Sequence, residues 1–267
     1  MEKKLLRELS LFAVIAAALC NVIGGGINVL IVEIQNDIIG IGNYVPLAMI
    51  VAGIPALLIS LVYASISTAF PRPGGEYLYI SRSISPAIGF TVAFIKWASA
   101  IIIAGTVAYM DVLILKDALF FLGLQQIASL FNLPIFQIIG SLMILWFFWF
   151  VNYIGVKVYG RVVIVLALLM LIGGFAMMFI GFTHNHSQFL AITKADVPNV
   201  KETNSVFDFI LAVATLFWAY IGFTSIAQSA GEIKDWKRNL PRAFIFSAII
   251  VTLYYVFYSA AFYQTCL

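Results

Sequence analysis

The stretch "NVIGGGIN", residues 21–28, places three consecutive glycines inside a long apolar segment. Glycine costs about 1 kcal/mol relative to alanine within a helix, so Gly24, Gly25 and Gly26 favour local unwinding. Unwound backbone exposes N–H and C=O groups, which at membrane depth must face a polar cavity or other protein. A half-helix that starts after Gly26 would direct free N–H donors and a positive dipole end at an anion such as a carboxylate. The alternative is close helix packing through small residues.

The composition is that of an integral membrane protein. Of the 267 residues, 63% are hydrophobic and 10% are charged, and the mean hydropathy is +1.05. These values exclude an ordinary soluble domain. The apolar stretches are continuous, whereas the strands of a barrel would alternate, so we expect helices. Seven stretches are long enough to cross a bilayer: residues 11–35, 44–69, 86–114, 134–153, 160–183, 205–230 and 243–265.

Lysine and arginine are divided unequally between the two sides of these spans. Eleven lie on the side of the N-terminus and three on the other side, which predicts a cytoplasmic N-terminus. The net charge of +3 therefore reflects topology and not a nucleic-acid surface. The cytoplasmic set is Lys3, Lys4, Arg7, Arg72, Arg82, Lys157, Arg161, Lys234, Lys237, Arg238 and Arg242, and the outer set is Lys116, Lys194 and Lys201.

The sixth span contains a second glycine interruption. It reads "TLFWAYIGFTSIAQSAGEI" over residues 215–233, with Gly222 near its centre. Aromatic residues and hydroxyls flank this glycine, among them Trp218, Tyr220 and Thr224. Glycine-interrupted helices at corresponding places in two halves of a chain indicate a transporter binding site. Beside a predicted break, the aromatic side chains could form a lid or a substrate wall, although packing is their usual role in membrane helices.

Three motifs resemble the amino acid–polyamine–organocation (APC) permeases. These are "NVIGGGI" at 21–27, "PRPGGEYLYISRSISPAIGF" at 71–90 and "FWAYIGFTSIAQSAGEIKDWKRNLPRA" at 217–243. The resemblance implies an all-α membrane protein with the inverted-repeat fold of the sodium-coupled leucine transporters, a LeuT-like fold in which helices 1 and 6 are broken at mid-membrane. On this basis residues 1–267 form a single transmembrane domain. Residues 11–183 would be the first five-helix repeat, and 205–267 the first two helices of a truncated second repeat.

The same resemblance implies where the substrate lies. Its carboxylate would meet backbone N–H groups around Gly24, Gly25 and Gly26, and its amino group would meet carbonyls near Ile23, Trp218 and Ile221. Trp218 stands at an aromatic gate of related antiporters. Gly25 stands where many members have serine, and Thr224 where some have an acidic residue. The predicted substrate-binding residues are Ile23, Gly24, Gly25, Gly26, Trp218, Tyr220, Ile221, Gly222 and Thr224.

Lys96 is a charge within the third predicted span. It lies ten residues beyond Pro86, or about 15 Å along a helix, which places it near mid-bilayer. A lysine at this depth is costly and normally faces a cavity or a partner. Two hypotheses remain open for it: a role in ion coupling, or a buried structural pair.

Other chemistry-bearing residues are sparse. His184 and His186 lack further ligands at metal spacing, so we expect a solvated loop and no metal site. Cys20 and Cys266 are expected to be small apolar residues and not a disulfide. No nucleophile–base pair occurs within a span, so we expect neither an enzyme nor a cofactor.

These features and the resemblance together predict an amino acid permease of the plasma membrane. It would carry an amino acid or related amine by alternating access, driven by a proton or sodium as the coupling ion or by exchange, with the lipid bilayer as its surroundings. Ten core helices are needed for the full fold, so we expect a fragment of a longer permease or a split gene product. The alternative is a non-transporting or incomplete membrane subunit that binds an amino acid or a partner protein. A retinal-type seven-helix protein is disfavoured, since residues 243–265 lack a lysine.

Overall fold

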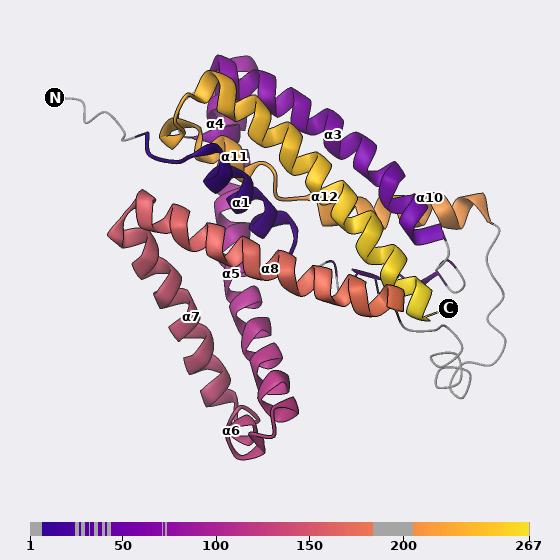
Figure 1. Cartoon of the computed structure of the whole chain (residues 1–267). Helices are drawn as coiled ribbons and strands as arrows, with labels where there is room; N and C mark the ends of the chain where they lie inside the picture. The colour runs from indigo at the N-terminus through magenta and orange to yellow at the C-terminus, as the bar shows by residue number, and fades with distance from the viewer. Residues whose placement is uncertain are drawn as a thin grey trace. The chain divides into compact units, whose positions relative to one another are not determined.

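The computed structural model is wholly helical across the residues it describes, apart from turns and one isolated bridge. It describes residues 7–24, 27, 30–31, 33–34, 37–38, 41, 44–70, 72, 74–183 and 205–266. Figure 1 shows the elements in chain order. They are α1 (Leu11–Val22), α3 (Val45–Ala69), α4 (Gly75–Ser83), α5 (Pro86–Phe121), α6 (Gln125–Leu130), α7 (Pro134–Ile154), α8 (Val156–Thr183), α10 (Val206–Phe217), the 3-10 turn η2 (Trp218–Tyr220), α11 (Ser225–Gln228), the 3-10 turn η3 (Ala230–Glu232) and α12 (Trp236–Cys266).

Six helical segments of the described chain are long and apolar enough to cross a membrane. They correspond to the second to seventh predicted spans. The sixth predicted span, residues 205–230, comprises α10, η2 and α11 together. The first predicted span is represented by α1, which has 12 residues and is too short to cross as one helix. The chain is therefore a multi-pass membrane protein, whereas the seven-span count and the inverted repeat stay predictions.

Serine residues begin three of these helices by capping free backbone N–H groups. Ser10 accepts from the Ala13 N–H at 3.2 Å in α1, and Ser205 accepts from the Asp208 N–H at 3.3 Å in α10. Ser85 caps α5, whose first residue is Pro86. A serine N-cap followed by proline is a strong helix start, because proline needs no hydrogen-bond acceptor there. The helix starts thus follow from local sequence.

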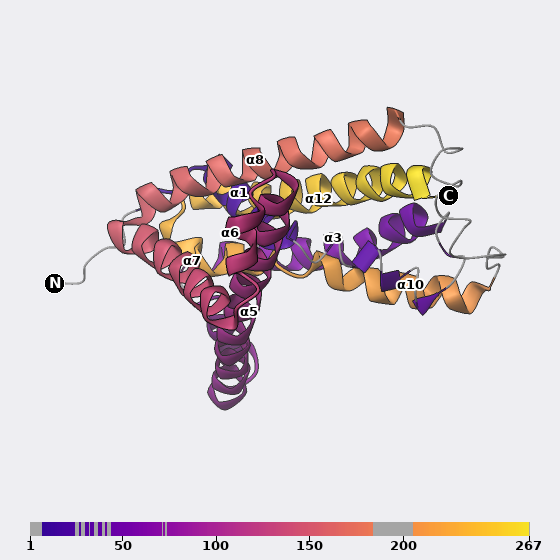
Figure 2. The same cartoon turned by 90° about the horizontal axis from the view of Figure 1, so that it is seen from below.

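The chain divides into two compact units, one of residues 1–75 with 160–267 and one of residues 76–159. In the first unit α3 and α12 run side by side over most of their length, as both views show (Figures 1 and 2). Their contact includes small residues. Gly53 faces the Thr252 side chain, and Ala48, Ala52 and Ala248 are wholly buried. Small side chains allow two helix backbones to approach closely, which is the usual way that membrane helices associate.

Helix α8 also packs within the first unit. Gly160 lies against Leu9, and Gly181 lies against the backbone of Ala261 in α12. The Cys20 thiol of α1 donates to the Val163 carbonyl of α8 at 3.8 Å and is not in a disulfide. The side chain of Cys266 lies outside the described residues. Helices α1, α8 and α12 are therefore joined through close backbone contacts.

The second unit is a helical hairpin extended by α4. Helices α5 and α7 contact each other, with α6 at the turn between them, and they diverge with distance from that turn (Figure 1). The Tyr109 hydroxyl donates to Gln137 Oε1 at 2.9 Å, and the amide nitrogen of Gln137 donates to the Phe131 carbonyl at 2.7 Å. Most of the apolar surface of α5 and α7 is exposed, as expected for helices that face lipid or other membrane helices.

Two glycines of α8, Gly181 and Gly173, allow a test of how α8 packs on α12. A Cβ added at Gly181 would lie 2.7 Å from the Ala261 carbonyl oxygen, whereas one added at Gly173 would have no atom within 4 Å. We expect Gly181→Ala to lower the free energy of unfolding by about 1–3 kcal/mol through overpacking. Gly173→Ala should leave it unchanged or raise it by up to about 1 kcal/mol. Thermal unfolding of the two variants in detergent measures the difference, and equal midpoints would contradict this packing.

Candidate functional site

The first helix ends immediately before the glycine run. Its last residue is Val22, and the Ile23 N–H donates back to the Leu19 carbonyl at 2.7 Å. Ile23 and Gly24 lie in a bend. Gly24 is exposed, and a Cβ at this residue would meet no atom within 4 Å. Gly25 and Gly26 lie outside the described residues. Helical geometry is present again at Ile27.

The chain is also non-helical at the second predicted interruption. Helix α10 ends at Phe217, the 3-10 turn η2 follows, and Ile221 is extended with ψ 131°. Gly222 then has φ +142°, a conformation that only glycine adopts without strain. Ser225 begins α11, and its hydroxyl donates to the Gly222 carbonyl at 2.8 Å. Four residues between η2 and α11 thus have no helical hydrogen-bond ladder.

The second non-helical segment touches the end of α1. A Cβ on Gly222 would lie 2.8 Å from the Asn21 carbonyl oxygen and 2.8 Å from a methyl carbon of Val22. Gly222 therefore requires glycine for two independent reasons, its positive φ and this close approach. The end of α1 and the interruption after α10 are brought into direct contact, although about 200 residues of chain separate them.

We call the contact of Gly222 with Asn21 and Val22 the helix junction. Tyr255 of α12 stabilises it. Its hydroxyl lies 2.7 Å from the Val22 carbonyl oxygen and 3.0 Å from the Ala219 carbonyl oxygen, and the residue is wholly buried. Its ring packs edge-on against Tyr220, with centroids 5.2 Å apart. Backbone carbonyls freed at a helix end are costly in apolar surroundings unless a donor reaches them. One buried side chain thus reaches carbonyls at the end of α1 and in η2, next to the two non-helical segments.

The predicted site residues differ in how they are presented. Trp218 is 61% exposed and Ile221 is 60% exposed, so both side chains stand clear of the core. Tyr220 is 3% exposed, and its hydroxyl donates to the Met49 carbonyl at 2.8 Å, which ties η2 to α3. Thr224 is half-buried, and Ile23 is buried. The structure therefore gathers Ile23, Gly24 and the residues from Trp218 to Thr224 in one unit, while their part in binding stays a prediction.

Lys96 belongs to the second unit, residues 76–159, and forms an ion pair within it. Its ammonium group forms an ion pair with Glu76, the second residue of α4. The Glu76 side chain is 12% exposed and that of Lys96 is 36% exposed. A partly buried lysine with a carboxylate partner fits the structural-pair hypothesis. The coupling hypothesis for Lys96 stays a prediction.

Sequence reasoning did not identify Tyr255 or Asn21. Asn21 is the second-to-last residue of α1, and its polar side chain is exposed beside the junction. Tyr255 stands within the run "TLYYVFY", residues 252–258, where nothing in the sequence distinguishes it from its tyrosine neighbours. A signal exists for Asn21 alone, since an amide inside an apolar helix is unusual.

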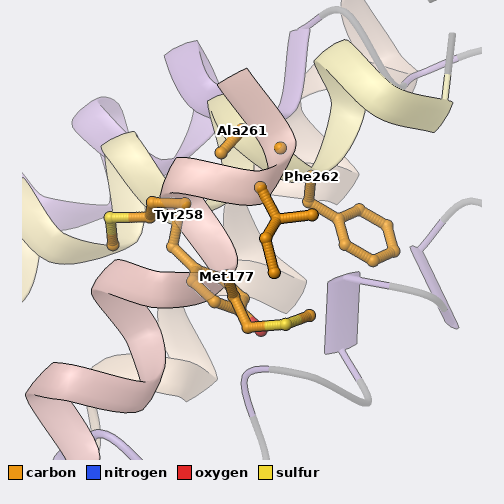
Figure 3. A pocket seen from close by; sticks show the side chains of 7 residues that line it. Met177, Tyr258, Ala261 and Phe262 are labelled. Carbon is orange, nitrogen blue, oxygen red and sulfur yellow. The ribbon is translucent and has the colours of Figure 1, made fainter. Parts of the chain in front are cut away.

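A small apolar pocket lies elsewhere in the first unit. It has a volume of about 80 Å³ and is formed by α8 and α12. Figure 3 shows Met177 of α8 with Tyr258, Ala261 and Phe262 of α12 around it. None of the predicted site residues lines this pocket. In the described part of the chain, no group of three or more His, Cys, Asp or Glu residues could hold a metal ion, and His184 and His186 lie outside that part.

Comparison with known proteins gives a consistent result. The family described as "Amino acid permease" matches residues 9–266. The cadaverine/lysine antiporter of Escherichia coli K12 is 27% identical over 255 residues, which cover 94% of this chain and 52% of the antiporter. The branched-chain amino acid permease BcaP of Bacillus subtilis is 24% identical over 278 residues, which cover 97% of this chain and 55% of BcaP. The chain thus spans about half the length of these curated relatives.

The junction itself can be tested with two glycines. Gly222→Ala combines a strained φ with a Cβ that collides with the Asn21 carbonyl, whereas Gly24→Ala meets no atom within 4 Å. We expect Gly222→Ala to destabilise the junction by about 1.4 kcal/mol or more, which speeds amide hydrogen exchange in residues 217–225 about tenfold. Gly24→Ala should leave this exchange unchanged. Exchange rates that are equal in the two variants would contradict the contact between Gly222 and the end of α1.

Proposed function

The chain belongs to the amino acid permease family of the APC superfamily, and from this premise we propose that it carries an amino acid or a related amine across the cell membrane by alternating access. The observation that carries the proposal is the contact between Gly222, in the second non-helical segment, and Asn21 at the end of α1. Where two interrupted helices meet in a transporter, their free backbone N–H and C=O groups and helix ends lie close together and can bind a substrate. The N-terminus would be cytoplasmic, as the distribution of lysine and arginine predicts.

The substrate carboxylate would bind at the first interruption. Gly24 is exposed and leaves open space where any other residue would carry a side chain. The half-helix predicted to start after Gly26 would supply N–H donors and the positive end of its dipole. Ile27, the first described residue after the glycines, is helical and buried, which supports a helix start at this point.

The substrate amino group would bind at carbonyls near Ile23, Trp218 and Ile221, next to the Val22 and Ala219 carbonyls that Tyr255 contacts. The Val22 carbonyl also accepts from the Gly24 N–H at 3.1 Å, whereas the single proton of Tyr255 is shared between the Val22 and Ala219 carbonyls. An ammonium group has several N–H donors and would satisfy whichever carbonyl Tyr255 leaves. Binding would then stabilise the closed arrangement of both segments through one shared set of acceptors.

The wall beside these backbone groups is apolar. Trp218 and Ile221 are both exposed at the second interruption, and Thr224 supplies a hydroxyl where a carboxylate would be needed to pair a second ammonium group. We therefore favour a zwitterion with an apolar side chain over a diamine. Trp218 would cover the bound substrate as a lid.

The moving part would be the bundle of the first, second, sixth and seventh spans. Helices α1, α3, α10, α11 and α12 all belong to the first compact unit and contact one another there. The bundle would rock against the remaining scaffold, which includes α8, although α8 packs against α12 within the same compact unit. The coupling ion would be a proton or sodium. The second candidate function is a non-transporting or incomplete membrane subunit that binds an amino acid or a partner protein.

Binding and uptake distinguish the two candidates. The purified 267-residue chain is reconstituted into liposomes, and labelled leucine, lysine and cadaverine are offered with pH and sodium varied on either side. Saturable binding with uptake supports the permease. Saturable binding without uptake supports the incomplete subunit. If none of the three compounds binds, the permease and a subunit that binds an amino acid both fail.

Removing one hydroxyl tests the role of Tyr255. Tyr255→Phe keeps the ring but leaves the Val22 and Ala219 carbonyls without this donor, at a cost of about 1–3 kcal/mol. We expect substrate affinity to fall about tenfold or more, since the binding arrangement is no longer held in place. Tyr254→Phe is the matched control, because its hydroxyl makes no hydrogen bond within the described residues. Affinity that falls equally in both variants would count against the bridge.

A further inference from the structure

A large open pocket at the start of α12 is unrelated to the helix junction. Its volume is about 680 Å³, within the range of about 300–1,000 Å³ that small-molecule sites occupy. We call it the basic pocket. It is lined by Arg7, Lys234, Asp235, Trp236, Lys237 and Arg238.

Backbone pairing holds the two sides of the basic pocket together. The Leu9 N–H donates to the Glu232 carbonyl at 3.0 Å, and the Lys234 N–H donates to the Leu9 carbonyl at 3.0 Å. Leu9 and Ile233 form a parallel bridge, and both side chains are buried. In Figure 1 the first described residues lie beside the segment between α11 and α12. Arg7 is therefore fixed next to the residues that begin α12.

The charge in the basic pocket is not neutralised. Four cationic side chains face one carboxylate, that of Asp235. Within the described residues, no carboxylate lies within 4.0 Å of any of the four cations. The Arg7 guanidinium carbon and the Lys237 ammonium each lie 5.7 Å from the centroid of the Trp236 ring. These cation–π contacts gather positive charge around one indole ring.

The basic pocket lies where a membrane-spanning helix begins. Trp236 is the first residue of the candidate span Trp236–Phe262, and tryptophan at such a position marks the level of the lipid headgroups. Farther along α12, Phe246, Ile249, Leu253 and Phe257 are between 40% and 54% exposed and recur at helical spacing. An apolar stripe thus continues from the charged start of the helix, so a ligand with a charged head and an apolar chain would contact both.

We propose that the basic pocket binds the phosphate headgroup of an anionic phospholipid in the adjoining leaflet. The four cations would bind the phosphate, Trp236 would pack against the glycerol region, and the acyl chain would follow the exposed stripe of α12. Clustered lysine and arginine next to a spanning helix are the usual mark of anionic lipid recognition. The side on which the basic pocket lies is the one predicted to be cytoplasmic, where Lys and Arg are in excess.

Brominated lipids test this proposal through Trp236. The unaltered chain is placed in nanodiscs that contain phosphatidylcholine with either brominated phosphatidylglycerol or brominated phosphatidylcholine. The fluorescence of Trp236→Phe is subtracted, which isolates Trp236 from the other four tryptophans. We expect the brominated anionic lipid to quench Trp236 at about a tenfold lower mole fraction, a preference of about 1.4 kcal/mol. Equal quenching by both lipids would overturn the proposal, and this comparison needs no charge variant.

Two triple variants then locate the selectivity. Lys234→Gln/Lys237→Gln/Arg238→Gln should remove the preference for the anionic lipid. Arg82→Gln/Lys157→Gln/Arg161→Gln removes the same charge outside the basic pocket and should retain it. Salt at about 1 M should also weaken the preference, because the Debye length falls from about 8 Å to about 3 Å. An equal loss in both triple variants, or the abolition of Trp236 quenching by millimolar inorganic phosphate, would overturn the assignment to a lipid.

Discussion

A carbonyl or N–H group freed from a helix in apolar surroundings must find another partner, and this constraint organises the first unit of the structure. Tyr255 meets it by donating to Val22 at the end of α1 and to Ala219 in η2. Tyr220 acts in a similar way by tying η2 to the Met49 carbonyl of α3. Two tyrosines thus fix the backbone of the interruption relative to the helices around it.

The helix junction depends on glycine and on tight helix pairs. Gly222 lies so close to Asn21 that no side chain fits, and its φ is one that other residues avoid. Glycine also stands where α12 packs closely against α3, at Gly53, and against α8, at Gly181. Close backbone contacts of this kind hold membrane helices together where the hydrophobic effect cannot. Helix α12 takes part in the contacts at Gly53 and Gly181 and also carries Tyr255.

Anions would be recognised in two different ways along this chain. At the helix junction the available groups are backbone dipoles, which suit a substrate carboxylate that must be released again. At the basic pocket they are full charges around Trp236, at the level where a membrane presents phosphate groups. The helix that begins at the basic pocket is the one that supplies Tyr255 to the junction. A lipid bound at its start would therefore contact the same element that holds the substrate site.

The sequence by itself determined the membrane class, the family, the approximate spans from the second to the seventh, and the places where helix was expected to fail. These follow from hydropathy, glycine and proline positions and capping serines, which are local properties. Only the tertiary structure decided which tyrosine of "TLYYVFY" reaches Val22 and Ala219. It also decided that Tyr220 is buried while Trp218 is exposed, and that Lys96 pairs with Glu76. Each depends on which helix faces lie against each other, and residues far apart in sequence acquire that relation only when the helices pack.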